Sequence, residues 1–371
     1  MPAYQGRFVD ALADECSEVV CFLHSPEADE LAKMDYALQK QNVRLVHLGP
    51  HTSVPRRLLS VRKYARVLRK AKQSLDALLL RGPSPLLPAL ADAVRPLPIA
   101  LLLVGDAVAL LDDLRQPFWR RVAIHLLWRW NRHRQDQIAK RSLTFVNSRK
   151  LFRELQPVIP NLVETRTTTL TRSDFFDRED TCTCAPYHLL YTGRMTRGKG
   201  LIEMVEALAL LVQGGENVVL DLVGWPEKGD DVMVEMEQLA VRLKVPERVK
   251  YFGRKVAGPD LFAHYREADI YVIASKTSEG FPRTIWEAMA HSLPVVATSL
   301  GSMPEFLGAA AEFVIPANSC DLARAIRLLI KTPIRRREMI HLGRSLALDS
   351  TLETQVGNLI RGVERWARRP Q

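Results

Sequence analysis

The sequence of 371 residues lacks any apolar run long enough to cross a lipid bilayer. Its longest apolar stretch, residues 97–105, is far shorter than the roughly 20 residues that a membrane-spanning helix needs, and the acidic Asp106 follows it. Met1 is followed by a polar helical pattern instead of a basic start and an apolar stretch, so we expect no signal peptide. These absences together predict a cytoplasmic protein.

Cysteine is also scarce. The five cysteines lack the paired spacings of disulfide frameworks and of zinc sites, so we expect free thiols. Cys182 and Cys184 could instead form a metal-binding or redox pair. Free thiols are favoured over this alternative, because the two cysteines lie in a polar segment without a nearby histidine.

The rest of the composition is that of a globular protein. With 47% hydrophobic and 25% charged residues, a chain of this length suits two domains that each bury a core. The net charge of +10 is uneven, because residues 1–160 hold 25 Lys and Arg against 15 Asp and Glu, whereas residues 161–371 hold 27 of each. This asymmetry predicts an anionic partner for the N-terminal domain, attracted over long range.

From His188 onward, short β-rich runs alternate with amphipathic stretches, the pattern of a parallel sheet covered by helices. The expected strands are residues 188–192, 218–223, 249–252, 270–274, 295–298 and 312–315. The expected helices begin near Gly200, Asp231, Pro259, Thr284, Met303 and Cys320. This alternation predicts a doubly wound domain.

The first half shows the same alternation less clearly and favours a second Rossmann-like domain. Its expected strands are residues 19–23, 43–48, 77–80, 99–104 and 143–146. Only five residues precede the helix expected from Gly6 to Cys16, so we expect the first strand of this domain to be missing. The expected divisions are an N-terminal domain at 1–163, a linker at 164–185, a C-terminal domain at 186–345, and a helix at 346–371 returning toward the N-terminal domain.

Two acidic residues, Glu279 and Glu287, flank one of the expected helix starts. Gly280 and Pro282 prevent a continuous helix between them, so we expect Glu279 on a loop and Glu287 in the first turn of a helix. The backbone N–H groups of that turn favour a phosphate. The alternative is a capping box, in which Glu287 and Thr284 only satisfy the helix terminus.

A second loop, residues 191–200, joins a strand end to a helix start. Its glycines permit close backbone approach to a ligand, while Arg194 and Lys199 could neutralise a diphosphate. A solvated basic turn is the alternative for such a loop taken alone. Because both loops follow strands of one doubly wound domain, where ligands gather at the carboxyl ends of strands, we favour phosphate binding.

Residues 189–307 resemble the donor domain of the family 4 glycosyltransferases. The likeness rests on the motifs YTGRMTRGKG, LVGWP, YFGRK, ADIYVIAS, EGFPRTIWEAMAHSLPVVAT and GSMPE. The resemblance implies the α/β GT-B fold, in which two Rossmann-like doubly wound domains face a central cleft. It also implies a retaining hexosyltransferase that moves a sugar from a nucleotide-sugar donor to a lipid-linked or saccharide acceptor, in polysaccharide or glycolipid synthesis.

The resemblance further implies roles for single residues. Arg194 and Lys199 would hold the donor diphosphate and Glu279 the sugar hydroxyls, and these three are the catalytic candidates. Glu287 would bind the ribose. The other donor-binding candidates are Gly193, Gly224, Arg254, Lys255, Val256, Gly280, Phe281 and Pro282. No cofactor beyond the donor substrate and no metal is implied; the sequence holds no Asp-x-Asp pattern, and two cations with a helix N-terminus could stabilise the leaving diphosphate instead.

The N-terminal half departs from the family. Residues 103–106 stand where family members often place a His-containing motif, and Gly6 and Asp106 are the acceptor-side candidates. These departures leave open a degenerate GT-B protein that binds a nucleotide sugar or a partner without turnover. A glycosidase, with Glu279 as nucleophile and Glu287 as acid and base, is disfavoured by the basic loops.

A basic amphipathic helix is expected in the N-terminal half, with its apolar stripe at Val61, Tyr64, Leu68, Ala71 and Leu75. Cations fill the positions between them: Arg62, Lys63, Arg66, Arg69, Lys70 and Lys72. Residues 119–134 add three tryptophans among five arginines. Together they predict docking on an anionic membrane, peripherally on the inner face of the cell membrane. The alternative is a stripe packed on the core under solvated cations; nucleic acid fits least, because no nucleic-acid motif is present.

Overall fold

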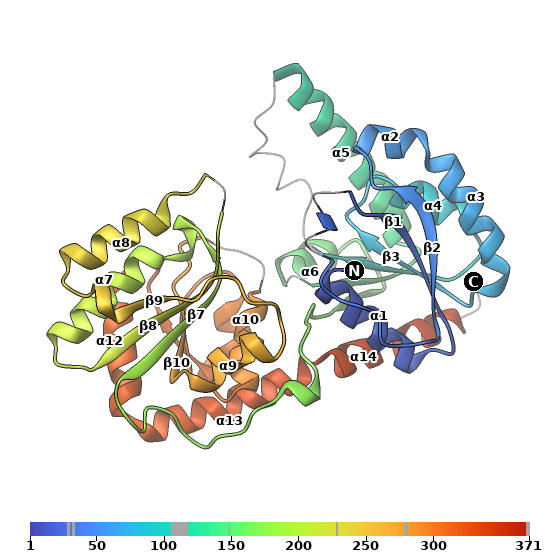
Figure 1. Cartoon of the computed structure of the whole chain (residues 1–371). Coiled ribbons are helices and arrows are strands. Elements are labelled where there is room, and N and C mark those ends of the chain that lie inside the picture. The colour runs from blue at the N-terminus through green and yellow to red at the C-terminus, as the bar shows by residue number, and fades with distance from the viewer. Residues whose placement is uncertain are drawn as a thin grey trace. The chain divides into compact units, whose positions relative to one another are not determined.

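The computed structural model describes residues 1–27, 30–31, 34–104, 118–147, 149–227, 229–277 and 281–368. The chain divides into two compact units (Figure 1). Unit 1 comprises Met1–Thr167 together with Gln355–Gln371, and unit 2 is the continuous segment Thr168–Thr354. Each unit is a parallel α/β structure with its own core.

Unit 1 holds two parallel sheets, a pair β1-β2 and a four-stranded sheet in the order β3-β4-β5-β6. Their strands are β1 (Val19–Ser25), β2 (Val43–Pro50), β3 (Leu78–Gly82), β4 (Ile99–Leu103), β5 (Leu143–Val146) and β6 (Leu162–Glu164). Every residue of β4 is buried, because this apolar strand has neighbours on both sides and its two faces are covered.

The helices of unit 1 pack on both faces of the four-stranded sheet and beside the pair β1-β2. They are α1 (Ala3–Glu15), α2 (Val54–Leu59), α3 (Val61–Ala71), α4 (Leu87–Ala93), α5 (Phe118–Ala139), α6 (Arg149–Leu155) and α14 (Leu352–Ala367). Leu101 and Leu103 of β4 face the core shared with α4, α5 and α6, whereas Ala100 and Leu102 face α1 and Leu359 of α14. The period of two along a strand explains this division.

Unit 2 contains one six-stranded parallel sheet in the order β12-β11-β10-β7-β8-β9. Its strands are β7 (Tyr187–Met195), β8 (Val218–Pro226), β9 (Val249–Tyr251), β10 (Ile270–Ile273), β11 (Val295–Thr298) and β12 (Ala311–Val314). The chain adds β8 and β9 on one side of β7 and then crosses to add β10 on the other. The direction of winding therefore reverses between β7 and β10, which is where doubly wound sheets bind ligands.

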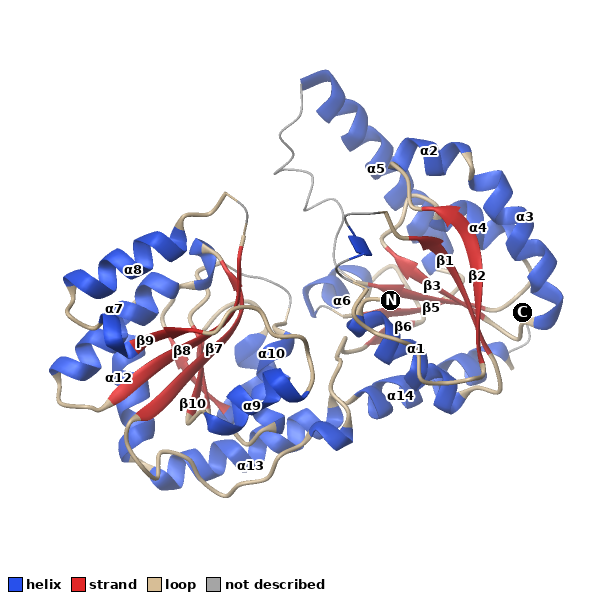
Figure 2. Ribbon diagram, in the orientation of Figure 1, coloured by secondary structure: helices blue, strands red, loops and turns tan. Residues whose placement is uncertain are grey.

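Helices cover both faces of this sheet (Figure 2). They are α7 (Leu201–Gln213), α8 (Val232–Arg242), α9 (Pro259–Glu267), α10 (Arg283–Ala290), α11 (Met303–Leu307), α12 (Ser319–Lys331) and α13 (Pro333–Asp349). One core lies between the sheet and α7, α8 and α12, and the other between the sheet and α9, α10 and α11. Two separate apolar cores explain why both faces of the central strands carry mainly apolar side chains.

The expected alternation of strands and helices is confirmed, with strand ends shifted by no more than three residues. Strand β6 was not expected, since it is three residues long and only partly buried. The final helix was expected from residue 346, but this position lies inside α13, and α14 begins only at Leu352 after a break at Ser350 and Thr351. In the part of the chain that the structure describes, no helix has the length and apolar character to cross a membrane.

Candidate functional site

Two loops meet at the point where the winding of unit 2 reverses. The loop after β7 and the loop after β10 are joined by a backbone hydrogen bond, in which Lys276 N–H donates to the carbonyl of Gly198 at 2.8 Å. A Cβ added to Gly198 would lie 3.5 Å from Oγ1 of Thr277, so a side chain at this position would contact the loop after β10. The structure thus brings together the two loops that the sequence singled out.

The loop after β7 presents two cations in different environments. The buried Tyr191 donates its hydroxyl proton to the carbonyl of Arg194 at 2.8 Å and so fixes the backbone of this loop. The Arg194 guanidinium is exposed, and its Nη1 lies 3.2 Å from Oε2 of Glu227. Lys199, in contrast, is only 8% exposed. A buried ammonium group is costly to desolvate unless anions or dipoles surround it, so Lys199 is the stronger candidate for a fixed anion-binding charge.

Gly224, at the end of β8, is required by close packing of two strands. A Cβ at this position would lie 1.7 Å from the carbonyl oxygen of Gly193 on β7, and its φ of +156° is one that side chains rarely adopt. The sequence attributed this glycine to close approach of a ligand. In the structure, glycine is required at position 224 because the neighbouring strand β7 leaves no room for a side chain. The close packing of β7 and β8 also sets where the two following loops start.

The loop after β10 returns to α10 through an aromatic cluster. Phe281 stacks on Trp286 with ring centroids 4.3 Å apart and meets Phe306 edge-on at 5.6 Å. Pro282 is the N-cap of α10, with φ −70° and ψ 119°. Glu279 and Gly280, the centre of the predicted sugar site, lie outside the described residues.

Glu287 is not in the first turn of its helix. Because α10 begins at Arg283, Glu287 is its fifth residue, and Pro282 occupies the N-cap where Thr284 was considered. The capping-box interpretation is therefore wrong. The Glu287 carboxylate instead accepts a hydrogen bond from the Tyr265 hydroxyl at 2.8 Å and is 8% exposed.

The partner of Glu287 belongs to a buried polar network that the sequence did not reveal. The hydroxyl of Tyr265 on α9 lies 2.7 Å from Oγ1 of Thr192 on β7, which in turn lies 3.2 Å from the hydroxyl of Tyr271 on β10. Burial, followed by the charge of Glu287, raises the pKa of Tyr265 well above its usual value, and burial raises the pKa of Tyr271 to about 12. The sequence did contain a signal for this network, because tyrosines occupy apolar positions of α9 and β10 and a buried phenol needs a hydrogen-bond partner.

The loop after β9, which holds the donor-binding candidates Arg254, Lys255 and Val256, lies beside the end of β8. The carbonyl of Gly253 accepts from Gly224 N–H at 2.9 Å, and the Arg254 guanidinium lies 5.5 Å from the ring centroid of the half-exposed Trp225. Lys255 is partly buried and Val256 is exposed. Trp225 was not predicted, although a tryptophan directly after a loop glycine is a clear signal for a stacking surface.

Residues 186–332 match the sequence profile of the family described as Glycosyl transferases group 1. This segment is a group 1 glycosyltransferase domain. It is similar to the D-inositol 3-phosphate glycosyltransferase of Pseudarthrobacter chlorophenolicus, with 32% identity over 164 residues, which are 44% of this chain and 38% of that protein. It is also similar to the amylovoran biosynthesis glycosyltransferase AmsK of Erwinia amylovora, with 29% identity over 33% of this chain and 30% of that protein. The matches therefore span about a third of these relatives' length.

Solved structures extend the likeness of the fold beyond the group 1 domain. A glycosyltransferase from Rickettsia africae superposes with a TM-score of 0.72 at 17% identity, covering 99% of this chain and 95% of that one. Anabaena Alr3699/HepE in complex with UDP gives a TM-score of 0.72 at 18% identity over 98% and 96%. At such identities the likeness establishes the fold, which is GT-B and confirms the expected fold class.

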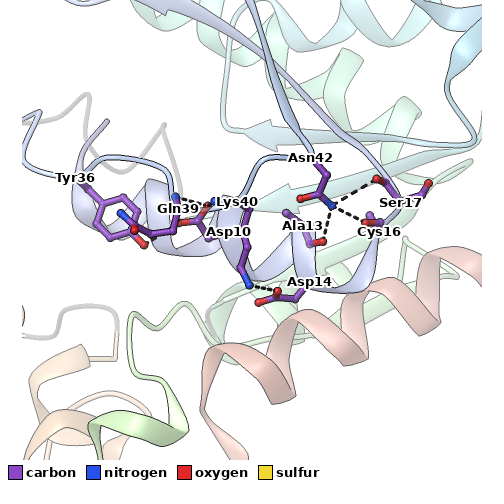
Figure 3. A network of polar contacts seen from close by, with 9 residues as sticks. All are labelled: Asp10, Ala13, Asp14, Cys16, Ser17, Tyr36, Gln39, Lys40 and Asn42. Carbon is purple, nitrogen blue, oxygen red and sulfur yellow. Dashed lines mark hydrogen bonds and ion pairs between the residues drawn. The ribbon is translucent and has the colours of Figure 1, made fainter.

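The acceptor-side candidates lie outside the group 1 domain, in unit 1. Gly6, on α1, packs against Tyr36, and a Cβ on Gly6 would lie 2.2 Å from Cδ1 of that ring. Asp10, one turn further along α1, accepts from the Tyr36 hydroxyl at 2.8 Å and from the N–H groups of Gln39 and Lys40 (Figure 3). This packing is sufficient to explain Gly6. Asp106 lies outside the described residues.

The apolar stripe of the basic helix α3 faces inward. Tyr64 and Leu68 are 4% and 2% exposed, and Val61 packs against a cluster that contains Leu48 and Leu86. The stripe therefore packs on the core, as in the alternative interpretation, and docking on an anionic membrane stays a prediction that involves the cations of the opposite face. The cations of the opposite face are exposed: Arg62, Lys63, Arg66, Arg69 and Lys70.

Helix α5 contributes apolar side chains at the surface of the same unit. Leu126 and Trp130 are 63% and 58% exposed, and the Arg134 guanidinium lies 5.9 Å from the Trp130 ring centroid.

Among the described residues, no group of three His, Cys, Asp or Glu side chains is arranged to hold a metal ion. All five cysteines, each within the described residues, are free thiols.

Proposed function

We propose that this protein is a retaining, metal-independent hexosyltransferase that moves a sugar from a nucleotide-sugar donor to a lipid-linked or saccharide acceptor. The observation that supports it best is the contact between the loops after β7 and β10, through Lys276 N–H and the Gly198 carbonyl. Arg194 and Lys199 lie on the first of these loops and the second loop leads to α10, both at the winding reversal of a group 1 domain. Cations and a helix N-terminus are the groups that bind a diphosphate.

The proposed chemistry is mainly electrostatic. The bond between the anomeric carbon and the diphosphate oxygen breaks, and Arg194 and Lys199 stabilise the negative charge that develops on the leaving diphosphate. The acceptor hydroxyl attacks from the face that the diphosphate leaves, and its proton passes to a phosphate oxygen. Glu279 holds the sugar hydroxyls, Glu287 holds the ribose, and Arg254 to Val256 line the base pocket.

Relatives support a nucleotide sugar as donor. Structures of Anabaena Alr3699/HepE, which shares the fold, contain UDP and UDP-glucose. The curated relatives are named as transferases of D-inositol 3-phosphate and of amylovoran synthesis. Both names fit a saccharide or polyol acceptor hydroxyl, and we include polysaccharide or glycolipid synthesis in the proposal.

The cationic face of α3 supports peripheral binding to the inner face of the cell membrane. With the apolar stripe packed inward, the attraction is electrostatic and involves the anionic headgroups. The exposed Leu126 and Trp130 of α5 are of the kind that sits at a membrane interface. Such docking would keep the enzyme beside a lipid-linked acceptor.

Thermal unfolding of the purified full chain tests the donor proposal, because a ligand that binds only the folded state raises Tm by mass action. UDP-, GDP-, ADP- and dTDP-sugars are screened, each without metal and with EDTA. A rise in Tm with one base, followed by sugar transfer to a saccharide or polyprenyl phosphate acceptor, is the expected result. Binding without transfer would favour the degenerate GT-B alternative, and no shift with any donor would contradict the proposal.

A further inference from the structure

Tyr265 on α9 occupies a central place in the interior of unit 2. Its side chain is fully buried, and its hydroxyl joins two elements by donating to Glu287 on α10 at 2.8 Å and contacting Oγ1 of Thr192 on β7 at 2.7 Å. Thr192 directly precedes Gly193 and Arg194, the start of the loop after β7. The tyrosine therefore connects the predicted diphosphate loop with the predicted ribose ligand.

The carboxylate fixes the direction of the hydrogen bonds. An ionised carboxylate only accepts, so the single hydroxyl proton of Tyr265 goes to Glu287. The Tyr265 oxygen then accepts from the Thr192 hydroxyl at 2.7 Å. The Tyr271 hydroxyl lies 3.2 Å from Oγ1 of Thr192 and donates to the Thr192 backbone carbonyl at 3.4 Å. The raised pKa of Tyr265 keeps the phenol protonated at neutral pH, as this donation requires.

Ring packing holds Tyr265 in place. Its ring stacks on His291 with centroids 5.3 Å apart and planes inclined by 23°, and it lies 5.9 Å from the ring of Tyr271. Nδ1 of His291 lies 2.7 Å from the backbone carbonyl of Glu287, which can only accept, so His291 is protonated at Nδ1. Burial lowers the pKa of His291, which keeps the ring neutral. Glu287 and His291, one helical turn apart, thus supply the carboxylate that Tyr265 contacts and the ring on which Tyr265 stacks.

We infer that Tyr265 is a positioning residue for the donor ribose: it holds one oxygen of the Glu287 carboxylate and thereby orients the group toward the ribose hydroxyls. The inference rests on the proposed function, because the ribose is the ligand assigned to Glu287 there. A carboxylate oriented in advance binds a diol better than one that must be ordered on binding. Loss of the Tyr265 hydroxyl should therefore weaken recognition of the ribose more than recognition of the diphosphate.

The test compares two phenol deletions that differ in their contact with Glu287. Tyr265→Phe removes the donor to the carboxylate. Tyr271→Phe is the matched control, because this tyrosine is also fully buried and its hydroxyl lies against Thr192, at the far end of the network. Thr192→Val removes the donor to Tyr265 and provides a second, milder variant. Circular dichroism and Tm report on folding.

The probe is whichever of UDP, GDP and ADP binds the wild-type chain, paired with its 2′,3′-dideoxy form, and Kd is measured by calorimetry. We expect the wild type to prefer the ribose form by about 10-fold or more, since hydrogen bonds to a charged group are lost in the dideoxy form. Tyr265→Phe should reduce this preference to about 3-fold, Thr192→Val should reduce it less, and Tyr271→Phe should keep it. With the donor sugar, Tyr265→Phe should raise KM more than it lowers kcat.

Each failure has its own signature. If Glu287→Gln loses the preference and the folded Tyr265→Phe keeps it, the positioning role is overturned while the proposed function stands. If Tyr271→Phe loses the preference as much as Tyr265→Phe, the network acts only through packing, which also overturns the role. If Glu287→Gln keeps the preference, the ribose assignment is overturned and the inference with it. If only dTDP binds, which lacks the 2′-hydroxyl, the ribose assignment is overturned while the proposed function stands. If neither dTDP nor any of the three ribonucleoside diphosphates binds, the proposed function itself is contradicted.

Discussion

The two units of this protein are both parallel α/β structures, yet the charged groups that we propose for binding are buried in unit 2 and exposed in unit 1. Unit 2 buries Lys199 and Glu287, each 8% exposed, near the winding reversal of its sheet. Unit 1 exposes a row of cations along α3 and packs the apolar side of that helix inward. Buried charges need partners held at fixed positions, whereas surface charges act over a distance and are screened by salt. We therefore propose that unit 2 recognises a small ligand and that unit 1 is attracted to an extended anionic surface.

The largest effect is expected at Glu279, which the proposal assigns to the donor sugar. Glu279→Gln should lower kcat on the order of 100-fold, as loss of one preorganised polar contact in a transition state does, while the Kd for the nucleoside diphosphate changes little. Steady-state kinetics and calorimetry with the donor identified by screening measure the two quantities. Unchanged turnover would remove Glu279 from the site.

The next largest effect separates the buried from the exposed cation of the loop after β7. Lys199→Met should weaken nucleoside diphosphate binding by about 10- to 100-fold, since a buried charge-assisted contact is lost. Arg194→Ala should weaken it by about 5-fold or less, because this side chain is exposed and already paired with Glu227. Both variants are compared by Kd after their Tm has been measured. Equal losses would show that burial does not decide which cation holds the diphosphate.

A smaller effect, confined to unit 1, concerns the membrane. Arg66→Gln with Lys70→Gln should reduce binding to vesicles containing 30% anionic lipid by about 10-fold or more, at roughly 1 kcal/mol for each cation. The matched control removes two exposed cations of unit 2, by Arg242→Gln with Lys250→Gln, and should bind like the wild type. Co-sedimentation at low and high salt gives both values. Equal recovery with neutral vesicles would argue against docking.

The smallest effect is the pH dependence of one tyrosine in unit 1. Burial, followed by the bond to Asp10, raises the pKa of Tyr36 from its usual 10 to about 12. Between these pH values the unfolded chain has lost the phenol proton and the folded chain keeps it, so the free energy of unfolding decreases as pH rises. The contribution is complete below pH 10 and lost through pH 12. Urea denaturation from pH 9 to 12 should show a steeper decrease for the wild type than for Tyr36→Phe.

The sequence also predicted different features in the two units. In unit 2 the strands and the two loops could be predicted, because buried parallel strands and glycine-rich loops have strong local patterns. The partner of Glu287 could not, since Tyr265 lies 22 residues away on another helix and only the fold brings them together. In unit 1 the amphipathic pattern of α3 was evident, but the pattern does not say whether a core or a membrane receives the apolar side. Tyr64 and Leu68 answer that question only in the folded chain.

Strand and helix boundaries show where local signals compete. Thr284 and Glu287 have the spacing of a capping box, but Pro282 starts the helix earlier because proline fixes a φ compatible with the end of a loop. Gly6 and Gly224 suggested ligand contact, and the structure shows a tyrosine ring and a neighbouring carbonyl at their missing Cβ positions. A glycine in a sequence indicates close approach without naming what approaches.

Because unit 1 is formed from two separate segments of the chain, the two units can fold at different times during synthesis. Unit 2 is one continuous segment, whereas unit 1 is completed by residues after Gln355, including Leu359, which is buried beside Leu143 and Phe145. On the ribosome, the second unit can therefore close before the first. Until α14 emerges, the apolar face of β4 and β5 that it covers stays open to water and to other chains. A chain cut short after Thr354 would therefore be prone to aggregation although all residues of unit 2 are present.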